Sequence, residues 1–310
     1  MAIGDLTRVR TGACSDLFYV DVGLYDTPGY GSVYVLDAER PAIIDTGLGA
    51  NYELILDALD DLGIAPEDVA VIAPTHAHLD HAGGAGYLAA ACPNATVAIH
   101  EIGAPHLVDP SRLVEGTKKA VGSRWQYYAE PEPIPEDRIT ELDGGDVVDL
   151  GDHSLEVHHA PGHAPHHAIC HDPANDAIFT ADDAGIYVPA REEIRPTTPP
   201  ADFHLGKSLA DVKTMQGIDP STLLFGHFGP RETGDALGTY AEILSEWVGA
   251  VASAREELLD DDSVIERFVE HAETAEMADV WGEEQAAAET GINVRGVLIS
   301  LDRYGEAARP

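Results

Sequence analysis

Four potential metal ligands lie within six consecutive positions of the sequence, in the stretch THAHLDHAGG at residues 75–84. They are His76, His78, Asp80 and His81. Because side chains alternate along a strand, a strand that ends here would project His76 and His78 to the same side. Asp80 and His81 would then turn toward a second point nearby. Neutral imidazoles and a carboxylate that converge in this way suit a divalent metal such as zinc, manganese or iron.

The elements that position this stretch are predicted from the apolar pattern around it. Residues 69–73 form an apolar run that ends just before the stretch, and residues 83–91 are compatible with a helix. Upstream, an apolar strand at 41–44 ends at Asp45, and residues 51–62 repeat apolar side chains at helical spacing. These elements predict a β-α-β unit. The histidine-rich stretch then lies at the carboxyl end of a strand, where open sheets usually build their sites.

Three further candidate ligands also follow predicted strands. His163 stands in the turn PGHAPHH, Asp182 follows the apolar run AIFT, and His227 follows the apolar run STLLF. Each turn repeats a strand, a small residue and then a potential ligand. Three histidines would suit one metal ion and two histidines with an aspartate would suit a second, with Asp182 bridging the two. The full candidate set is His76, His78, Asp80, His81, His163, Asp182 and His227.

This ordered set resembles the metallo-β-lactamase superfamily, whose H-x-H-x-D-H motif stands here at residues 76–81 and whose later ligand positions are all matched. The resemblance extends over roughly residues 15–230. It implies an α/β fold, a four-layer αββα sandwich with the metals at one edge, followed here by a C-terminal helical extension. Asp182 would span both metals, and Asp45 would support the metal loop. The other implied ligands are His76, His78 and His163 for the first metal and Asp80, His81 and His227 for the second.

The resemblance implies a binuclear metal-dependent hydrolase. Two divalent cations about 3.5–4 Å apart would lower the pKa of a bridging water, so that a metal-bridging hydroxide attacks the substrate. Zinc is the expected metal, with iron or manganese as alternatives, and Asp80 is the candidate catalytic residue because it could orient the hydroxide. The PGHAPHH turn resembles the P-G-H-T-P-G-H turn of glyoxalase II, with Ala164 for threonine and His166 for glycine, while Ala181 replaces a glycine common in the family. We therefore expect a glyoxalase II-like hydrolase of a small ester, thioester or lactone.

Two other activities of the superfamily are alternatives. The same turn also resembles that of persulfide dioxygenases, in which one iron would be held by His76, His163 and Asp182. A nuclease is disfavoured because the chain has 18 basic and 55 acidic residues, and the resulting negative charge would repel a phosphate backbone. His167 could orient a metal-ligating side chain by donating a hydrogen bond to it. His166 is interpreted as surface or pocket lining.

Two loops without a specific motif are expected to determine the substrate. Residues 101–136 carry Trp125, Tyr127 and Tyr128 and are interpreted as a pocket wall or lid. These aromatic side chains could equally pack the insertion against the sheet. In the loop that follows the bridging aspartate, Tyr187 could donate a hydrogen bond to an oxyanion.

The length of 310 residues predicts more than one structural part. We expect a metallo-β-lactamase-fold domain at residues 1–233 and a C-terminal helical region at residues 234–310. Periodic apolar segments in the second part predict helices at 236–259, 263–275 and 293–304. That region carries no cluster of histidine and aspartate residues, so we place the chemistry in the first part.

The composition is strongly acidic, with a formal net charge of -37 spread over the whole chain. We interpret this as a surface adapted to high salt, where screening shortens the range of repulsion. The sequence shows neither an apolar leader nor a membrane-spanning stretch, and its three widely spaced cysteines, Cys14, Cys92 and Cys170, fit reduced thiols in a cytoplasmic protein. The expected partner is a small-molecule substrate rather than a nucleic acid or a membrane. The oligomeric state stays open, with a homodimer as one option.

Overall fold

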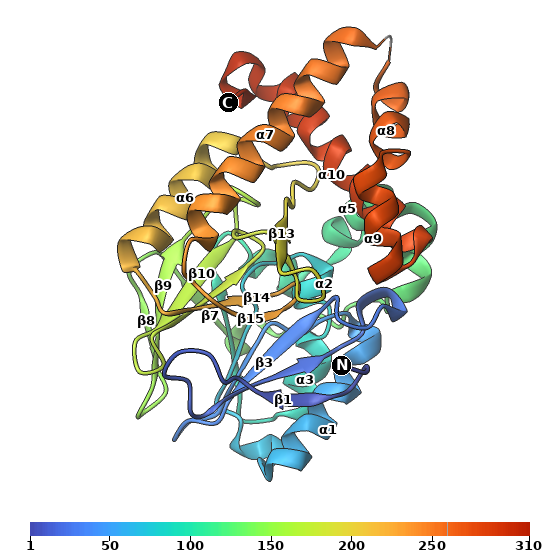
Figure 1. The fold of residues 1–310 in the computed structure, drawn as a ribbon. Coiled ribbons are helices and arrows are strands. Elements are labelled where there is room, and N and C mark those ends of the chain that lie inside the picture. The colour runs from blue at the N-terminus through green and yellow to red at the C-terminus, as the bar shows by residue number, and fades with distance from the viewer. Residues whose placement is uncertain (259) are drawn as a thin grey trace. The chain divides into compact units, whose positions relative to one another are not determined.

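The computed structural model describes residues 1–258 and 260–310, which fall into two compact units. We describe each unit by itself and use the element labels of Figure 1. Unit 1 consists of Met1–His159, His166–Ala181 and Pro220–Thr233. Unit 2 consists of Ala160–Pro165, Asp182–Asp219 and Gly234–Pro310. The chain therefore passes between the units several times, and the division into domains 1–233 and 234–310 stays a prediction.

Unit 1 contains a seven-stranded sheet whose strands follow chain order (Figure 1). The strands are β1 (Leu6–Arg8), β2 (Leu17–Asp21), β3 (Ser32–Leu36), β4 (Ala42–Ile44), β5 (Val71–Ala73), β6 (Thr96–His100) and β7 (Ile139–Leu142). Neighbours from β1 to β4 pair antiparallel, and neighbours from β4 to β7 pair parallel. Helix α1 (Tyr52–Leu62) connects β4 to its parallel neighbour β5. The predicted β-α-β unit is confirmed.

A second sheet in unit 1 has six strands in the order β15-β14-β11-β10-β9-β8. These strands are β8 (Val147–Asp149), β9 (Ser154–His159), β10 (Ala168–Asp172), β11 (Ala177–Ala181), β14 (Thr222–Phe225) and β15 (Gly229–Glu232). Only β11 and β14 pair parallel among the described pairs of this sheet. The strands predicted before His163, Asp182 and His227 are therefore present as β9, β11 and β14.

An apolar core lies between these two sheets. Leu36 and Ile44 contribute to it from the first sheet, and Leu155 and Phe179 contribute from the second, each at most 1% exposed. Across the core, the rings of Tyr34 and Phe179 meet edge to face with centroids 5.5 Å apart. Burying a side chain of this size contributes about 1.5–3 kcal/mol to the free energy of folding. The core therefore stabilises the two sheets whose strand ends precede the candidate ligands.

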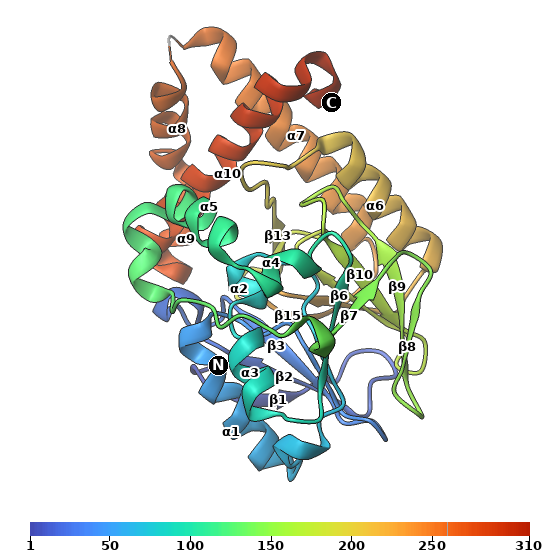
Figure 2. The ribbon, with the colours of Figure 1, turned by 180° about the vertical axis from the view of Figure 1, so that it is seen from behind.

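Some helices of unit 1 pack on the first sheet, and others form most of the insertion at residues 101–136. The helices after α1 are α2 (Leu79–Ala82), α3 (Ala85–Ala91), α4 (Ala104–Val108) and α5 (Ser111–Val121). Helices α1 and α3 contact strands β2, β5 and β6 (Figure 2). The helix expected at 83–91 is confirmed as α3. The insertion at 101–136 is irregular to helical as expected, with α4, α5 and a 3₁₀ turn at Gly122–Tyr127.

Unit 2 contains the small β12–β13 hairpin and most of the long helices. Its elements are β12 (Ile186–Val188), β13 (Glu193–Arg195), α6 (Leu205–Ile218), α7 (Ala236–Glu257), α8 (Asp261–Val269), α9 (Ala272–Trp281) and α10 (Glu283–Tyr304). The helix predicted at 236–259 is α7, and residue 259 lies outside the described residues. The helix predicted at 293–304 is the second half of α10, which begins earlier in the helix-favouring stretch EEQAAAET.

The single helix expected at 263–275 is wrong, because the chain forms two helices there. The carbonyl of Phe268 accepts hydrogen bonds from the His271 amide at 3.1 Å and from the Thr274 hydroxyl at 2.8 Å. These bonds occupy an oxygen that a continuing helix would use, so α8 ends and α9 begins.

The fold is the expected α/β sandwich, with two packed sheets, helices and a set of C-terminal helices. Among the described residues there is no helix of the length and apolar character needed to cross a membrane.

Candidate metal centre

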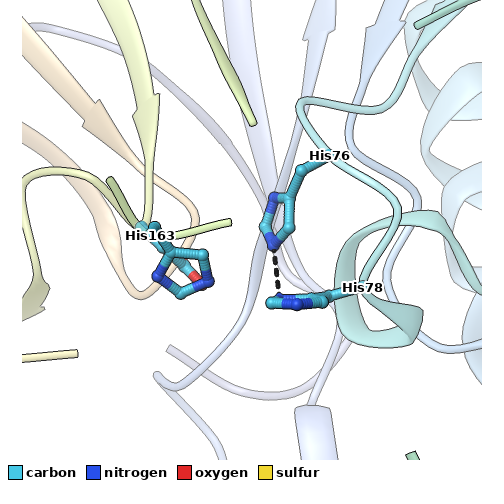
Figure 3. A group of neighbouring side chains, drawn as sticks. His76, His78 and His163 are labelled. Carbon is cyan, nitrogen blue, oxygen red and sulfur yellow. Dashed lines mark hydrogen bonds and ion pairs between the residues drawn. The ribbon is translucent and has the colours of Figure 1, made fainter. Parts of the chain in front are cut away.

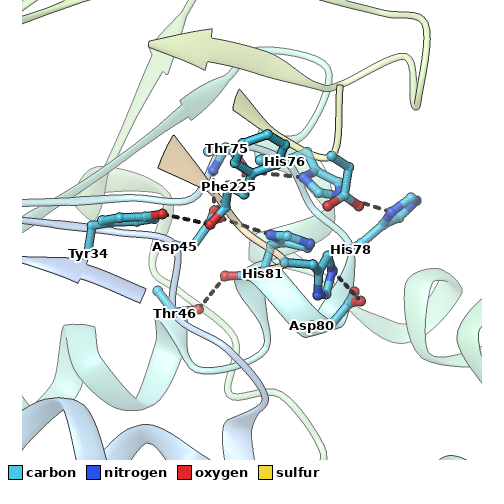
Figure 4. A network of polar contacts seen from close by, with 12 residues as sticks. Tyr34, Asp45, Thr46, Thr75, His76, His78, Asp80, His81 and Phe225 are labelled. Atoms are coloured by element: carbon cyan, nitrogen blue, oxygen red, sulfur yellow. Dashed lines mark hydrogen bonds and ion pairs between the residues drawn. The ribbon is translucent and has the colours of Figure 1, made fainter. Parts of the chain in front are cut away.

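The histidine-rich stretch of unit 1 runs from the loop after β5 into α2. His76 lies in the loop, His78 is the N-cap of α2, and Asp80 and His81 lie in its single turn. His76 and His81 are buried, whereas His78 and Asp80 are partly exposed. The rings of His76 and His81 are close, with centroids 4.2 Å apart (Figure 4). The stretch therefore forms one continuous polar region.

Asp80, His81 and His227 form a group whose ligand atoms all lie within 4.8 Å of one another. His227 follows β14, and its Nε2 atom is 3.8 Å from Oδ2 of Asp80. With metal–ligand bonds of about 2.0–2.2 Å, two ligand atoms of a tetrahedral site are about 3.3–3.6 Å apart. The group is thus close to the size needed for one divalent ion and has the donor types that such ions bind.

Both histidines of this group are oriented through their Nδ1 atoms. Nδ1 of His81 donates to Oδ2 of Asp45 at 2.9 Å, and Nδ1 of His227 donates to the carbonyl of Tyr30 at 2.9 Å. A carboxylate and a carbonyl accept but do not donate, so the proton of each neutral ring is on Nδ1. Nε2 is then the atom that can bind a metal, which is how metal-ligating histidines are usually held.

Asp45 connects this group to His76 (Figure 4). Its Oδ1 atom accepts from the backbone amide of Thr75 at 2.8 Å and from the Thr75 hydroxyl at 2.7 Å. Since that hydroxyl donates to Asp45, it accepts from Nδ1 of His76, 3.1 Å away. Asp45 is 3% exposed and has a φ of 61°, in the left-handed region that costs a non-glycine residue free energy. One buried carboxylate therefore orients His81 directly and His76 through Thr75.

His76 and His78 direct nitrogen atoms at each other. Nε2 of His76 is 2.9 Å from Nδ1 of His78 (Figure 3). This distance is that of a hydrogen bond and is shorter than the about 3.3–3.6 Å between two ligand atoms of a tetrahedral ion. The two rings would therefore have to move apart slightly to bind one ion together.

The remaining two candidates, His163 and Asp182, are neighbours in unit 2. Both are buried, and Nε2 of His163 is 3.1 Å from Oδ2 of Asp182. The turn before His163 packs on α6: the Gly162 amide donates to Oδ2 of Asp211 at 2.7 Å, and a Cβ atom at Gly162 would lie 2.3 Å from Cα of Ser208. Only glycine fits there. Of the seven predicted ligands, the structure thus groups five in unit 1 and two in unit 2.

Comparison with known proteins shows the family of the chain. A model of the metallo-beta-lactamase superfamily matches residues 26–227, more than half of the chain. The chain belongs to the metallo-β-lactamase superfamily. The solved structure of the superfamily protein ST1585 from Sulfolobus tokodaii shares its fold, with a TM-score of 0.69 at 23% identity over 92% of this chain and 99% of that chain.

Several relatives in the superfamily are similar in sequence. The metallo-beta-lactamase fold-containing protein ST1585 of Sulfurisphaera tokodaii is 28% identical over 70% of this chain and 79% of that protein. The acyl-coenzyme A thioesterase MBLAC2 of Gallus gallus is 28% identical over 54% of this chain and 62% of that protein. The hydroxyacylglutathione hydrolase of Maricaulis maris is 29% identical over 47% of this chain and 43% of that protein.

This superfamily member departs from the glyoxalase II turn at His166, which the structure places in unit 1. Nδ1 of His166 accepts a hydrogen bond from the Ala77 amide at 3.2 Å, so the ring holds the loop between His76 and His78. Burial, followed by the effect of nearby His78, lowers the pKa of His166 to about 2. His166 is thus a buried neutral ring. The sequence analysis interpreted His166 as surface or pocket lining. Its role as a hydrogen-bond acceptor was not predictable from local pattern, because the donor, the Ala77 amide, is 89 positions away.

Other predicted residues have less direct evidence. His167 is fully buried, and its ring centroid is 4.7 Å from that of His76, which agrees with a supporting position. Tyr187 lies in β12 of unit 2, and its role toward an oxyanion stays a prediction. At the other departure from the family, Ala181 has a φ of 43°, a left-handed conformation that glycine adopts without strain.

Proposed function

We propose that the chain is a metal-dependent hydrolase with two divalent ions, zinc being expected, that cleaves a small ester, thioester or lactone. The observation that carries the proposal is the group of Asp80, His81 and His227, in which both histidines are held through Nδ1 with Nε2 as the ligand atom. A merely structural polar cluster has no need of this shared orientation.

We propose that His163 and Asp182 complete the metal ligands. His163 lies three positions before His166, whose ring is bonded to the loop between His76 and His78. Asp182 directly follows β11, which pairs with β14, the strand that precedes His227. These short chain connections support a ligand set of His76, His78 and His163 for one ion and Asp80, His81 and His227 for the other, with Asp182 between them.

The chain's own residues would supply binding, orientation and proton handling. Bound metal ions lower the pKa of water and polarise a carbonyl group. We propose that Asp80, whose side chain is 24% exposed, accepts a hydrogen bond from an attacking water and so orients it. Asp45 and the Tyr30 carbonyl keep His81 and His227 in one tautomer throughout, so no proton needs to move on these rings.

The names of two relatives support a thioester among the candidate substrates. MBLAC2 is an acyl-coenzyme A thioesterase and the Maricaulis maris protein is a hydroxyacylglutathione hydrolase. Both align with the chain over less than two thirds of their own length. We therefore propose the reaction class, glyoxalase II-like hydrolysis, without choosing between their substrates.

Metal quantification on protein purified in high salt, combined with a panel of esters, thioesters and lactones, tests this function. We expect two zinc ions per chain, loss of hydrolysis after chelation and recovery when zinc is restored. Asp80→Asn should lower kcat strongly, while His171→Gln, which removes a histidine paired with Glu156 on β9, serves as the matched control. Two metals without activity on the panel would count against hydrolysis. One iron per chain with sulfide-dependent oxygen uptake would replace it with a persulfide dioxygenase.

A further inference from the structure

The turn that carries His163 lies against one face of helix α6, and both belong to unit 2. The contacts are made through Gly162, the residue directly before His163. On the helix side, the contact surface consists of His204, the N-cap of α6, and of Ser208 and Asp211 within the helix. Because residues spaced by four and seven positions lie on the same side of a helix, we call these three residues the α6 face.

The α6 face holds the peptide groups on both sides of Gly162. The Gly162 amide donates to Oδ2 of Asp211 at 2.7 Å, and the Gly162 carbonyl accepts from the His204 amide at 2.9 Å. The first bond fixes the peptide plane that precedes Gly162, and the second fixes the plane that leads into His163. The side chain of His163 therefore starts from a backbone that is held on its N-terminal side.

The turn also packs directly on the backbone of α6. A Cβ atom at Gly162 would lie 2.3 Å from Cα of Ser208, so no side chain separates the turn from the helix there. Ser208 and Asp211 are 3% and 6% exposed. The turn and the α6 face are thus one buried contact, and a change in that contact reaches His163 through a single intervening residue.

The start of α6 is itself anchored by the end of helix α10. The ring of His204 lies against that of Tyr304, with centroids 4.5 Å apart, and Arg303 pairs with Asp202 just before α6. These contacts all lie within unit 2. The helix that supports the His163 turn is therefore positioned by protein contacts alone.

His163 needs accurate placement if it binds a metal. Its Nε2 atom is 3.1 Å from Oδ2 of Asp182, the other proposed ligand of unit 2. Metal–nitrogen bonds of about 2.0–2.1 Å vary little, and a ligand works only when it is held to within about 0.5 Å. A residue that fixes the preceding turn can therefore determine metal affinity without touching the metal.

We propose that Asp211 is a positioning residue for metal binding, because its carboxyl oxygen holds Gly162 and thereby keeps the imidazole of His163 in place. The inference rests on the ligand role proposed above for His163 and adds a residue of α6 to the support of that ligand. An Asp211 with a merely structural role would stabilise the fold, but it would leave the metal affinity of the folded protein unchanged.

Titration of the full-length protein with zinc against a competing chelator tests the inference. Asp211→Ala removes the acceptor of the Gly162 amide and places a helix-favouring residue in α6. It should lower zinc affinity about 10- to 100-fold, as is typical when the support of a ligand is lost. Asp211→Asn should restore most of the affinity, because its amide oxygen can accept the same hydrogen bond.

A double-mutant cycle shows whether Asp211 acts through His163. His163→Gln should also lower zinc affinity, and adding Asp211→Ala to it should cause no further loss, since the positioned ring is already absent. An additional loss of the same size in the double variant would overturn the inference. Unchanged affinity in Asp211→Ala, or an Asp211→Asn variant no better than Asp211→Ala, would overturn it as well.

Asp219→Ala is the matched control, because it removes an acidic side chain from the C-cap of the same helix. Asp219 has a φ of 56°, which alanine tolerates poorly, so this variant should lose stability and keep its zinc affinity. An equal loss of affinity in Asp219→Ala would attribute the effect to the helix as a whole and refute the role of Asp211.

The same titrations separate the inference from the proposal on which it rests. Unchanged affinity in His163→Gln would refute the ligand role and the inference together, whereas a loss in His163→Gln without one in Asp211→Ala refutes the inference alone. If Asp211→Ala does not fold, Asp211→Ser replaces it, because the serine hydroxyl is one bond shorter than the carboxyl oxygen. Hydrolysis is not measured, so the result does not depend on the substrate.

Discussion

Replacing Asp45 with asparagine tests whether one carboxylate orients both parts of the candidate centre. Asparagine has nearly the same shape, but it offers one accepting oxygen where Asp45 uses two, one toward Thr75 and one toward His81. If the amide oxygen stays on Thr75, the NH₂ group faces Nδ1 of His81. That nitrogen must then accept a hydrogen bond, which moves the ring proton to Nε2, the atom that would bind the metal.

The size of the effect follows from the contacts that are lost. Removing the group that orients a metal ligand typically lowers metal affinity about 10- to 100-fold, or about 1.4–2.7 kcal/mol. In the metal-free protein, Asp45→Asn replaces the carboxylate that accepts from Thr75 and His81 by a neutral amide, which weakens these buried hydrogen bonds and should lower the free energy of unfolding by about 1–3 kcal/mol. The two effects are separable because one needs metal and the other does not.

Asp172→Asn provides the matched control for Asp45→Asn. Asp172 is fully buried and accepts from Nδ1 of His153 at 3.0 Å, from the Ala174 amide at 3.1 Å and from Asn175 Nδ2 at 2.8 Å. Titration of each variant with a competing chelator measures metal affinity, and urea unfolding measures stability. Both variants should lose stability, and only Asp45→Asn should lose metal affinity. Unchanged affinity in Asp45→Asn, or an equal loss in Asp172→Asn, would refute the reasoning.

Three further predictions concern packing, titration and salt. Gly162→Ala should lower the free energy of unfolding by about 1–3 kcal/mol, because its Cβ would meet the backbone of Ser208 in α6; Gly116→Ala, with open space around it, should not. Burial raises the pKa of the Cys170 thiol to about 12 and that of Cys92 to about 11, so neither should react with a thiol reagent at pH 8 before unfolding. Rapid labelling of the native protein would contradict this expected lack of reactivity. Because the folded state holds the two thiol protons more tightly, the contribution of these thiols to the free energy of unfolding should be full below pH 9.0 and decline as the pH rises toward 11 to 12. Finally, a net charge of -37 should make the Tm rise as salt increases from about 0.1 M to 1 M, where the Debye length falls from about 10 Å to 3 Å, and a flat Tm would argue against salt adaptation.

The sequence predicted the parts of the site that depend on local pattern. His76, His78, Asp80 and His81 stand together in the chain, so a strand end was enough to bring them close. His227 was predicted because the same arrangement of strand, small residue and ligand recurs there. Its orientation was not predictable, since the Tyr30 carbonyl that holds it is 197 positions away.

What the sequence did not predict depends on contacts between distant segments. The end of α8 depends on the Thr274 hydroxyl reaching back to the Phe268 carbonyl, although apolar periodicity continues through that point. The burial of Arg124 depends on packing against Tyr25, which stands 99 positions earlier in the chain. A single sequence records neither of these pairings.

The two histidines of the Asp80 group differ in whether a single substitution can remove the group that orients them. His81 is held by a side chain, so a single substitution at Asp45 can remove its partner. His227 is held by the backbone of Tyr30, and every amino acid at position 30 would present a carbonyl there. In a lineage of this protein, substitutions at position 30 should therefore leave a carbonyl for the proposed ligand His227, while a substitution at position 45 should remove the carboxylate that orients the proposed ligand His81.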